Sequence, residues 1–293
     1  RGDHWVGALG AARARVWPAV VDAPAAADAT VAVRAALGPL EGATPVELVA
    51  AVGLTLARWH HRRQGRAPIA PDPELDHAAD LVRMIRGAPD PDRARALGSY
   101  LCTVVDHGMN ASTFAARVVA STGSDPTSAV SAGLGALKGP LHGGAPGPVL
   151  DMLDAVGSAD RAEAWVDGEL AAGRRIMGMG HRIYRVRDPR VAVLEAAIVR
   201  LSRTGVTPGR LALARAVEQA AERALTALKP DRPLKANVEF ATAVLLEAIG
   251  IDRDAFTATF AAGRVVGWLA HVAEQQHTGR MIRPQSRYVG PTP

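Results

Sequence analysis

Three histidines lie in stretches that break helices, where a side chain can be presented to a ligand. His142 is in residues 138–147 (KGPLHGGAPG), with four glycines and two prolines around it. His181 follows Gly-Met-Gly, and His107 follows a long apolar segment in Asp-His-Gly. Glycine permits sharp bends and proline fixes them. The pattern favours rings held on rigid loops beside a ligand, although an ordinary connection between helices is the alternative.

Arginines gather near His181 and recur in an apolar context further on. Arg185 and its neighbours surround His181, and Asp188-Pro189 starts a helix with Arg190 in its first turn. The N-terminus of a helix attracts anions, and added arginines strengthen this. The alternative is a capped helix with an exposed basic turn. Arg264 lies within FAAGRVVGWLAHV, where an arginine is rarely unpaired.

Other charged stretches are less specific. Residues 229–235 (KPDRPLK) form a basic loop broken by prolines, and Asn237-Val238-Glu239 opens the next helix, where a glutamate usually stabilises the helix dipole. Residues 58–66 (RWHHRRQGR) are predicted to form a solvated basic face, with a contact to an anionic ligand as the lesser alternative. No histidine or cysteine spacing matches a metal site.

Composition limits the class of protein. The 293 residues are 48% hydrophobic and 4% aromatic, which is typical of a globular chain with an aliphatic core and room for two domains. The net charge of +5 suggests anionic partners, but the arginines are spread out and no nucleic-acid motif is present. Small anions or phosphates fit the charge equally well. No apolar run reaches the roughly 18 residues of a membrane helix.

The chain has no signal-peptide pattern, and its first residue is not Met, which suggests trimming or processing. The single cysteine, Cys102, excludes an intrachain disulfide and fits a reducing cytoplasm. We expect it to be a small buried residue.

Apolar spacing predicts an all-α chain without strands or repeats. The first 70 residues are expected to form short helices broken at Pro18, Pro24, Pro39 and Pro45. Ser112 or Thr113 is expected to cap a helix that ends near residue 121. The other predicted helices span residues 71–86, 94–105, 126–137, 149–156, 159–171, 207–227, 238–249 and 254–276, with a further start at Asp188-Pro189.

Residues 79–290 resemble citrate synthase, especially the bacterial and archaeal citrate and 2-methylcitrate synthases. Five motifs in the family's order carry the resemblance; residues 1–78 match poorly and look shorter than the family's usual N-terminal part. The motifs are DHGMNASTF from Asp106, GALKGPLHGG from Gly135, GMGHRIYRVRDPR from Gly178, GRVVGWLAHVAEQ from Gly263 and IRP from Ile282.

The resemblance implies an almost wholly α-helical homodimer whose active sites each borrow a residue from the partner subunit. It implies a large domain of residues 1–145 and 251–293, and a small domain of residues 146–250 that closes over the substrates. The implied enzyme is a cytoplasmic acyltransferase of the tricarboxylic acid cycle that acts on oxaloacetate and acetyl-CoA or propionyl-CoA. It would need no metal and no cofactor, with acetyl-CoA as a co-substrate, and it would bind neither nucleic acid nor membrane.

The resemblance also assigns roles to single residues. The catalytic set would be His142, which hydrogen-bonds the acyl-CoA carbonyl, His181, which polarises the oxaloacetate ketone, and Glu239 as the base. The implied oxaloacetate ligands are His107, Arg190, Arg264 and Arg283, with Arg283 supplied across the dimer interface. The implied CoA-binding residues are Arg185, Lys229, Arg232, Lys235 and Asn237.

One position departs from the family. The family's base is an aspartate in Asn-Val-Asp, and this chain has Glu239, which is one methylene longer. A displacement of about 1 Å at a reacting group can lower a rate on the order of a hundredfold. Glu239 can be a working base after local adjustment, the enzyme can be slow or suited to another acyl-CoA, or the protein can be a paralogue that binds ligands without efficient condensation. The first two are favoured because the other catalytic positions are filled.

Overall fold

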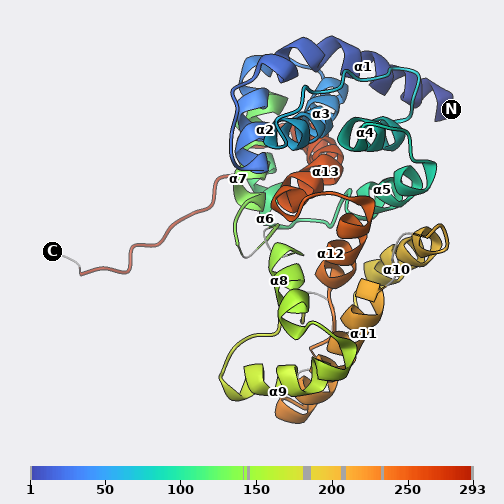
Figure 1. Cartoon of the computed structure of the whole chain (residues 1–293). Coiled ribbons are helices and arrows are strands. Elements are labelled where there is room, and N and C mark those ends of the chain that lie inside the picture. The colour runs from blue at the N-terminus through green and yellow to red at the C-terminus, as the bar shows by residue number, and fades with distance from the viewer. Residues whose placement is uncertain are drawn as a thin grey trace.

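The computed structural model describes residues 2–140, 142–143, 146–180, 186–205, 209–231 and 234–291. It confirms the all-α prediction: the only β pairing among these residues is an isolated bridge between Met179 and Ala236. Figure 1 shows an upper group of helices, α1 to α7 with α13, and a lower group, α8 to α11, with α12 between them.

The upper group packs around the long C-terminal helix. It comprises α1 (Gly2–Asp22), α2 (Ala29–Leu37), α3 (Pro45–Arg63), α4 (His77–Arg86), α5 (Pro91–Thr103), α6 (Ala111–Ala120), α7 (Pro126–Leu137) and α13 (Phe256–Thr278). Helix α13 contacts α2, α3, α5, α6 and α7. Its glycines permit close approach, since a Cβ at Gly267 would lie 2.0 Å from the Val105 carbonyl oxygen. The close approach of α13 therefore fixes the position of the loop that follows α5.

The lower group comprises α8 (Pro146–Val156), α9 (Ala162–Ala171), α10 (Pro189–Ser202) and α11 (Gly209–Leu228). Helix α12 (Val238–Ile249) contacts α8, α10 and α11 on this side and α5 on the other. Nearly all of its residues are buried, so it forms the junction between the two groups. Three short 3-10 helices span Gly38–Leu40, Ala159–Arg161 and Arg253–Ala255.

Helix starts follow from capping chemistry. The predicted Asp-Pro starts are confirmed, because Asp125 accepts from the Ser128 N–H and Asp188 accepts from the Arg190 N–H. Asn110, rather than Ser112 or Thr113, caps α6, since its side chain accepts from both of their backbone N–H groups. An amide side chain at this position satisfies two donors that the helix itself leaves unpaired.

Three local predictions are wrong. Helix α1 continues through Pro18, because Val16 and Val20 on either side are buried and hold it in place. The prediction of a solvated basic face is wrong for the first part of the basic run at residues 58–66. His60 and His61 are buried, and the buried Arg58 guanidinium donates to the carbonyls of Ala23 and Pro24, whereas Arg62, Arg63 and Arg66 are exposed. Cys102 is exposed, because the buried face of α5 is instead formed by residues such as Leu97 and Tyr100.

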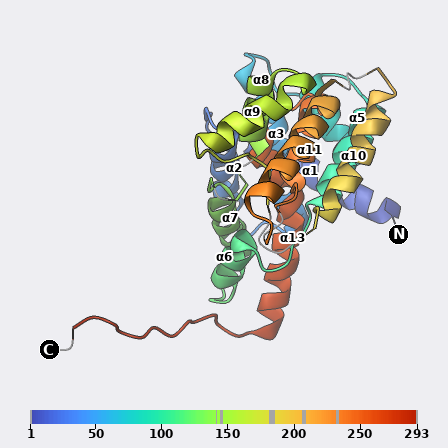
Figure 2. The ribbon, with the colours of Figure 1, turned by 90° about the horizontal axis from the view of Figure 1, so that it is seen from below.

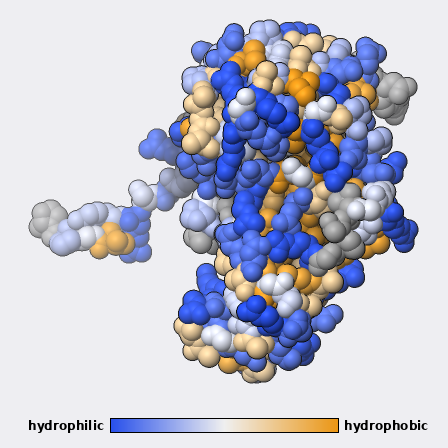
Figure 3. Space-filling model, in the orientation of Figure 1, coloured by the Kyte–Doolittle hydropathy of each residue, from blue (hydrophilic) through white to orange (hydrophobic). Residues whose placement is uncertain are grey.

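After α13, residues 279–291 form an extended segment. Its first residues contact the helices, because Gln275 donates to the Arg280 carbonyl and the Ile282 N–H donates to Ser121 Oγ. The rest of the segment stands away from the helices in both views (Figures 1 and 2). Gly279 ends α13 with a left-handed conformation. On the face in Figure 3, hydrophilic residues predominate and apolar residues form scattered patches. Within the described ranges, no helix combines the length and the apolar character needed to cross a bilayer.

Candidate active site

The loop between α5 and α6 carries His107, which is half-buried. Gly108 allows the turn with a φ of 58°, and its N–H donates to Asp106 Oδ2 at 3.0 Å. Burial acts to raise the pKa of Asp106, but the N–H groups of Gly108 and His107 and the His271 ring outweigh it and lower that pKa. The loop is therefore ordered around a charged Asp106 next to His107.

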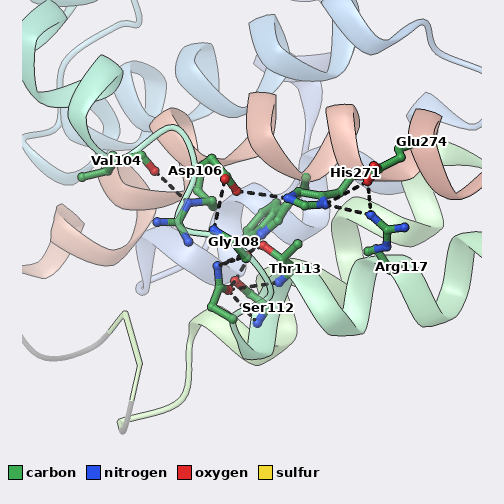
Figure 4. A network of polar contacts seen from close by, with 11 residues as sticks. Val104, Asp106, Gly108, Ser112, Thr113, Arg117, His271 and Glu274 are labelled. Atoms are coloured by element: carbon green, nitrogen blue, oxygen red, sulfur yellow. Dashed lines mark hydrogen bonds and ion pairs between the residues drawn. The ribbon is translucent and has the colours of Figure 1, made fainter. Parts of the chain in front are cut away.

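A chain of polar contacts leads from this loop along α13 (Figure 4). His271 Nδ1 lies 3.0 Å from Arg117 Nη1, and His271 Nε2 lies 3.2 Å from Asp106 Oδ1. Because a guanidinium only donates, Nδ1 accepts and Nε2–H donates to Asp106. Arg117 also contacts Glu274 and Gln275, and Gln275 Nε2 donates to the Arg280 carbonyl at 2.7 Å. These contacts connect the His107 loop to the start of the C-terminal segment.

His142 lies in the connection between α7 and α8, as predicted. Its N–H donates to the Gly139 carbonyl at 2.9 Å, and the Gly143 N–H donates to the Leu137 carbonyl at 2.8 Å. A Cβ at Gly143 would come 2.7 Å from that same oxygen, so this turn requires glycine. Burial, followed by the charge of Arg264, lowers the pKa of His142 to about 4. The imidazole is therefore neutral at physiological pH.

The His142 ring is held by Ser112 of α6, which sequence reasoning treated only as a cap. His142 Nε2 lies 2.9 Å from Ser112 Oγ, and Trp268 Nε1 donates to the same oxygen at 3.1 Å. Asn110 Oδ1 lies 2.8 Å from Ser112 Oγ, so the one hydroxyl proton can go to Asn110 or to His142. When Ser112 donates to Nε2, the imidazole proton resides on Nδ1.

Arg264 supplies a buried positive charge. Arg264 is 1% exposed, and its Nε donates to the Val104 carbonyl at 2.7 Å. Its guanidinium carbon lies over the Phe260 ring, 4.9 Å from the ring centre. Burial, followed by the charge of Arg190, lowers the pKa of Arg264 to about 10. No carboxylate of the described residues forms an ion pair with it. This arrangement can accept an anionic ligand.

Glu239 lies in the first turn of α12. The Asn237 side chain caps this helix by accepting from the Glu239 N–H at 3.0 Å, and it also donates to the Gly180 carbonyl at 3.1 Å. Burial raises the pKa of Glu239 to about 7, against the opposing effects of Asn237 and Arg190. A carboxyl with this pKa can take up or release a proton near neutral pH.

Backbone bonds hold the segment before α12 beside two other parts of the candidate site. The Asn237 N–H donates to Gly178, the Gly180 N–H donates to Lys235 and the Asp188 N–H donates to Ala236. Gly178 is fixed by close contact, because a Cβ there would lie 2.4 Å from the Phe240 ring. The segment before α12 is thereby held against residues 178–180 and Asp188, which precede it by about 50 residues.

Arg190 of α10 interacts electrostatically with Arg264 on α13 and with Glu239 on α12. Its guanidinium makes two hydrogen bonds to the Asp188 carboxylate, at 3.0 and 2.7 Å. Its positive charge reaches Arg264 in the upper group, where it lowers the pKa, and Glu239 on α12, where it also acts to lower the pKa. His142, Arg264, Arg190 and Glu239 thus form one connected set.

The remaining predicted site residues lie outside the described ranges, are exposed, or form an ion pair elsewhere. His181, Arg185 and Arg232 lie outside the described residues. Arg283 is exposed on the C-terminal segment, and Lys229 is exposed after α11. Lys235 forms an ion pair with Glu222 at 2.9 Å. In the part of the chain that the structure describes, no cluster of three or more His, Cys, Asp or Glu residues could hold a metal.

Sequence reasoning missed the residues that support the site. Ser112 and Trp268 hold His142, Phe260 places its edge against the His142 ring at 6.1 Å, and His271 supports Asp106. The signal for Ser112, Trp268 and His271 was their place within the motifs that start at Asp106 and Gly263; Phe260 lies just before the second motif.

Comparison with known proteins gives consistent matches. The family model described as citrate synthase, C-terminal domain, matches residues 15–285. A relative from Mycobacterium tuberculosis is 48% identical over 230 residues, which are 77% of this chain and 60% of that protein. The chain thus spans about three fifths of the length of that curated relative.

Two solved structures share the fold. Citrate synthase from Thermotoga maritima gives a TM-score of 0.83 at 33% identity, covering 98% of this chain and 79% of that one. Citrate synthase from Thermoplasma acidophilum, determined as a ternary complex with carboxymethyl coenzyme A and oxaloacetate, gives a TM-score of 0.86 at 25% identity. The match covers 99% of this chain and 81% of that one.

Proposed function

Because the chain belongs to the citrate synthase family, we propose that it condenses an acyl-CoA with oxaloacetate. The acyl-CoA is acetyl-CoA or propionyl-CoA, and the products are CoA with citrate or 2-methylcitrate. The oxaloacetate and CoA sites are inferred from the ternary complex of the Thermoplasma acidophilum relative.

The chemistry needs a base and an oxyanion donor on either side of the thioester. Glu239 removes a proton from the carbon next to the thioester carbonyl, and His142 Nδ1–H donates to the enolate oxygen. The enolate carbon then attacks the ketone carbon of oxaloacetate, whose oxygen takes a proton with His181 as donor. Water hydrolyses the resulting thioester and releases the CoA thiol.

One observation carries the proposal: the neutral His142 and the proton-exchanging Glu239 each lie near one of two arginines that also interact with each other. Arg264 acts on His142, Arg190 acts on Glu239, and the two arginines act on each other. A dicarboxylate next to a thioester would be bound by such a pair, because guanidinium groups hold carboxylates in fixed, often bidentate, geometry. His107 and Arg283 complete the proposed oxaloacetate ligands.

The proposed assembly is a homodimer in which each Arg283 serves the partner's site. Its support here is the exposed, extended C-terminal segment, which makes few contacts with its own chain. Residues 146–250 act as the small domain that closes over the substrates and excludes water. Arg185, Lys229, Arg232, Lys235 and Asn237 are the proposed CoA-binding residues.

A thiol-release assay tests the function. The protein is incubated with oxaloacetate and either acetyl-CoA or propionyl-CoA, and free thiol is measured over time. We expect release that depends on oxaloacetate and that is faster with one of the two thioesters. The Glu239→Gln variant, which keeps the size of the side chain, is the matched control and should release almost none. Absence of release with both thioesters from folded protein would remove the proposal.

A second candidate rests on Glu239 itself. With glutamate in place of the family's aspartate, the protein would be a weakened paralogue that binds CoA and a dicarboxylate without efficient turnover. Changing Glu239 to Asp separates the two candidates. A large gain in thiol release would favour the paralogue, and a loss would favour a site adapted to glutamate.

A further inference from the structure

Tyr100 of α5 is a buried tyrosine whose hydroxyl has no protein partner. The residue is 0% exposed, and no described residue lies within hydrogen-bonding distance of its hydroxyl oxygen. Leaving a buried hydroxyl unpaired costs about 1–3 kcal/mol. Most buried polar groups have a partner, so each exception in a folded protein requires an explanation.

The surroundings of this hydroxyl are positively charged. Arg264 and Arg190 both lie close enough to act on the Tyr100 phenol, where they oppose the increase in its pKa that burial causes. Arg264 is fixed on the same wall, because its Nε donates to the carbonyl of Val104, one turn after Tyr100. The side chains of Tyr100 on α5, Arg190 on α10 and Arg264 on α13 therefore lie near enough to one another to interact electrostatically.

A second donor at this place is also unpaired. Arg264 Nη1 is buried without a partner among the described residues, although the Nε of the same guanidinium is bonded. The nearby carboxylates do not form an ion pair with it, although the charge of Asp106 acts on Arg264 through space. Arg190 is already held by Asp188, and Asp106 is engaged with His271 and the N–H of Gly108. Among the residues that the structure describes, no negatively charged acceptor pairs with Arg264 Nη1.

We propose that the Tyr100 hydroxyl is a ligand of the substrate and donates a hydrogen bond to a carboxylate of oxaloacetate beside Arg264. This assignment rests on the proposed function and adds a neutral donor to its arginines. A carboxylate has about four acceptor positions, so it can accept from Tyr100 and from Arg264 at once. A phenol hydroxyl adds a directional bond without adding a third positive charge to a buried site.

The proposal predicts opposite effects on binding and on stability. Tyr100→Phe removes only the hydroxyl, so we expect the dissociation constant for oxaloacetate, measured by calorimetric titration of the full chain, to rise roughly 10- to 100-fold. Without ligand, the same variant loses an unpaired buried group, so its melting temperature should be unchanged or higher by a few degrees. A purely structural hydroxyl would give no change in oxaloacetate binding.

Thr55→Val is the matched control, because it also removes a buried hydroxyl, but one that is paired with the Ala51 carbonyl at 2.7 Å. It should leave oxaloacetate binding unchanged. Equal binding by wild type and Tyr100→Phe would overturn the role of Tyr100 and leave the proposed function intact. Failure of the wild-type protein to bind oxaloacetate would overturn both.

Discussion

At the scale of single residues, the proposed base Glu239 would determine the pH range in which the site works. Its pKa is raised to about 7 by burial, so an appreciable fraction is protonated at neutral pH. Only the carboxylate can accept a proton from the thioester. The raised pKa also makes the carboxylate a stronger base than an exposed glutamate, which suits it to a weakly acidic carbon.

We expect the rate of thiol release to fall about tenfold for each pH unit below the pKa of Glu239. His142 stays neutral over this range because its pKa is about 4. Glu239→Gln should lower kcat by at least about a thousandfold. It should not lower the melting temperature above pH 7, because the folded protein then no longer contains a buried charge at this position. A pH-rate profile with no inflection between pH 6 and 8 would contradict the assignment.

Ser112 Oγ contacts the His142 ring at Nε2, so removal of this hydroxyl should affect turnover more than binding. We expect Ser112→Ala to lower kcat roughly 10- to 100-fold with little change in the KM for oxaloacetate. It should also lower stability by about 1–3 kcal/mol, because Trp268 Nε1 loses its acceptor. Ser128→Ala is the control, since that hydroxyl contacts Asp125 at an exposed helix start. Unchanged kcat in Ser112→Ala would show that His142 is oriented without the serine.

At the scale of elements, the close approach of α13 to the loop after α5 positions His107. Gly267→Ala would place a methyl group 2.0 Å from the Val105 carbonyl, and backbone cannot yield as a side chain would. We expect a loss of about 1–3 kcal/mol in unfolding free energy, measured by chemical denaturation, together with weaker oxaloacetate binding. The displaced loop carries both Asp106 and His107.

The control for this prediction is Gly168→Ala in α9, where a new methyl group meets nothing within 4 Å. Alanine is the better helix former, so this variant should gain up to about 1 kcal/mol. If Gly267→Ala were as stable and as active as wild type, the contact between α13 and the loop would not set the position of His107.

Helix boundaries could be predicted where a capping pair marks them. Asp125-Pro126 and Asp188-Pro189 begin helices as expected, and α12 has the predicted bounds of 238–249. Pro18 misled the prediction, because the packing of α1 against α3 outweighs the one hydrogen bond that proline removes. The environment of Arg58 was also not predictable, since its acceptors are carbonyls more than 30 residues away.

Some features of the candidate site could likewise be predicted from the sequence, and others could not. Glycines and charges within apolar stretches made His142 and Arg264 candidates, whereas the role predicted for Glu239 came from the family resemblance. The sequence did not indicate the contacts that join Ser112 on α6, Trp268 on α13 and His142 in the loop between α7 and α8, which lie up to 156 residues apart. Helical periodicity shows which face of a helix is buried but not which other helix covers that face.

At the scale of the whole molecule, the proposed sharing of sites between subunits can be tested by complementation. Arg283→Ala and Glu239→Gln should each be nearly inactive alone. In a mixed dimer, the chain that retains Glu239 receives Arg283 from its partner, so one site of the two is intact. Random mixing should then restore about a quarter of wild-type thiol release. No recovery in refolded or co-expressed mixtures, with dimers confirmed by light scattering, would show that Arg283 acts within its own chain.

Trp268 is 0% exposed and shares the Ser112 hydroxyl with His142. An indole in that position is a natural optical reporter, since its emission responds to the polarity and hydrogen bonding around its nitrogen. Replacing the other four tryptophans with phenylalanine would leave a single fluorophore two hydrogen bonds from the imidazole. Its spectrum would then follow events at the histidine in real time, without any added label.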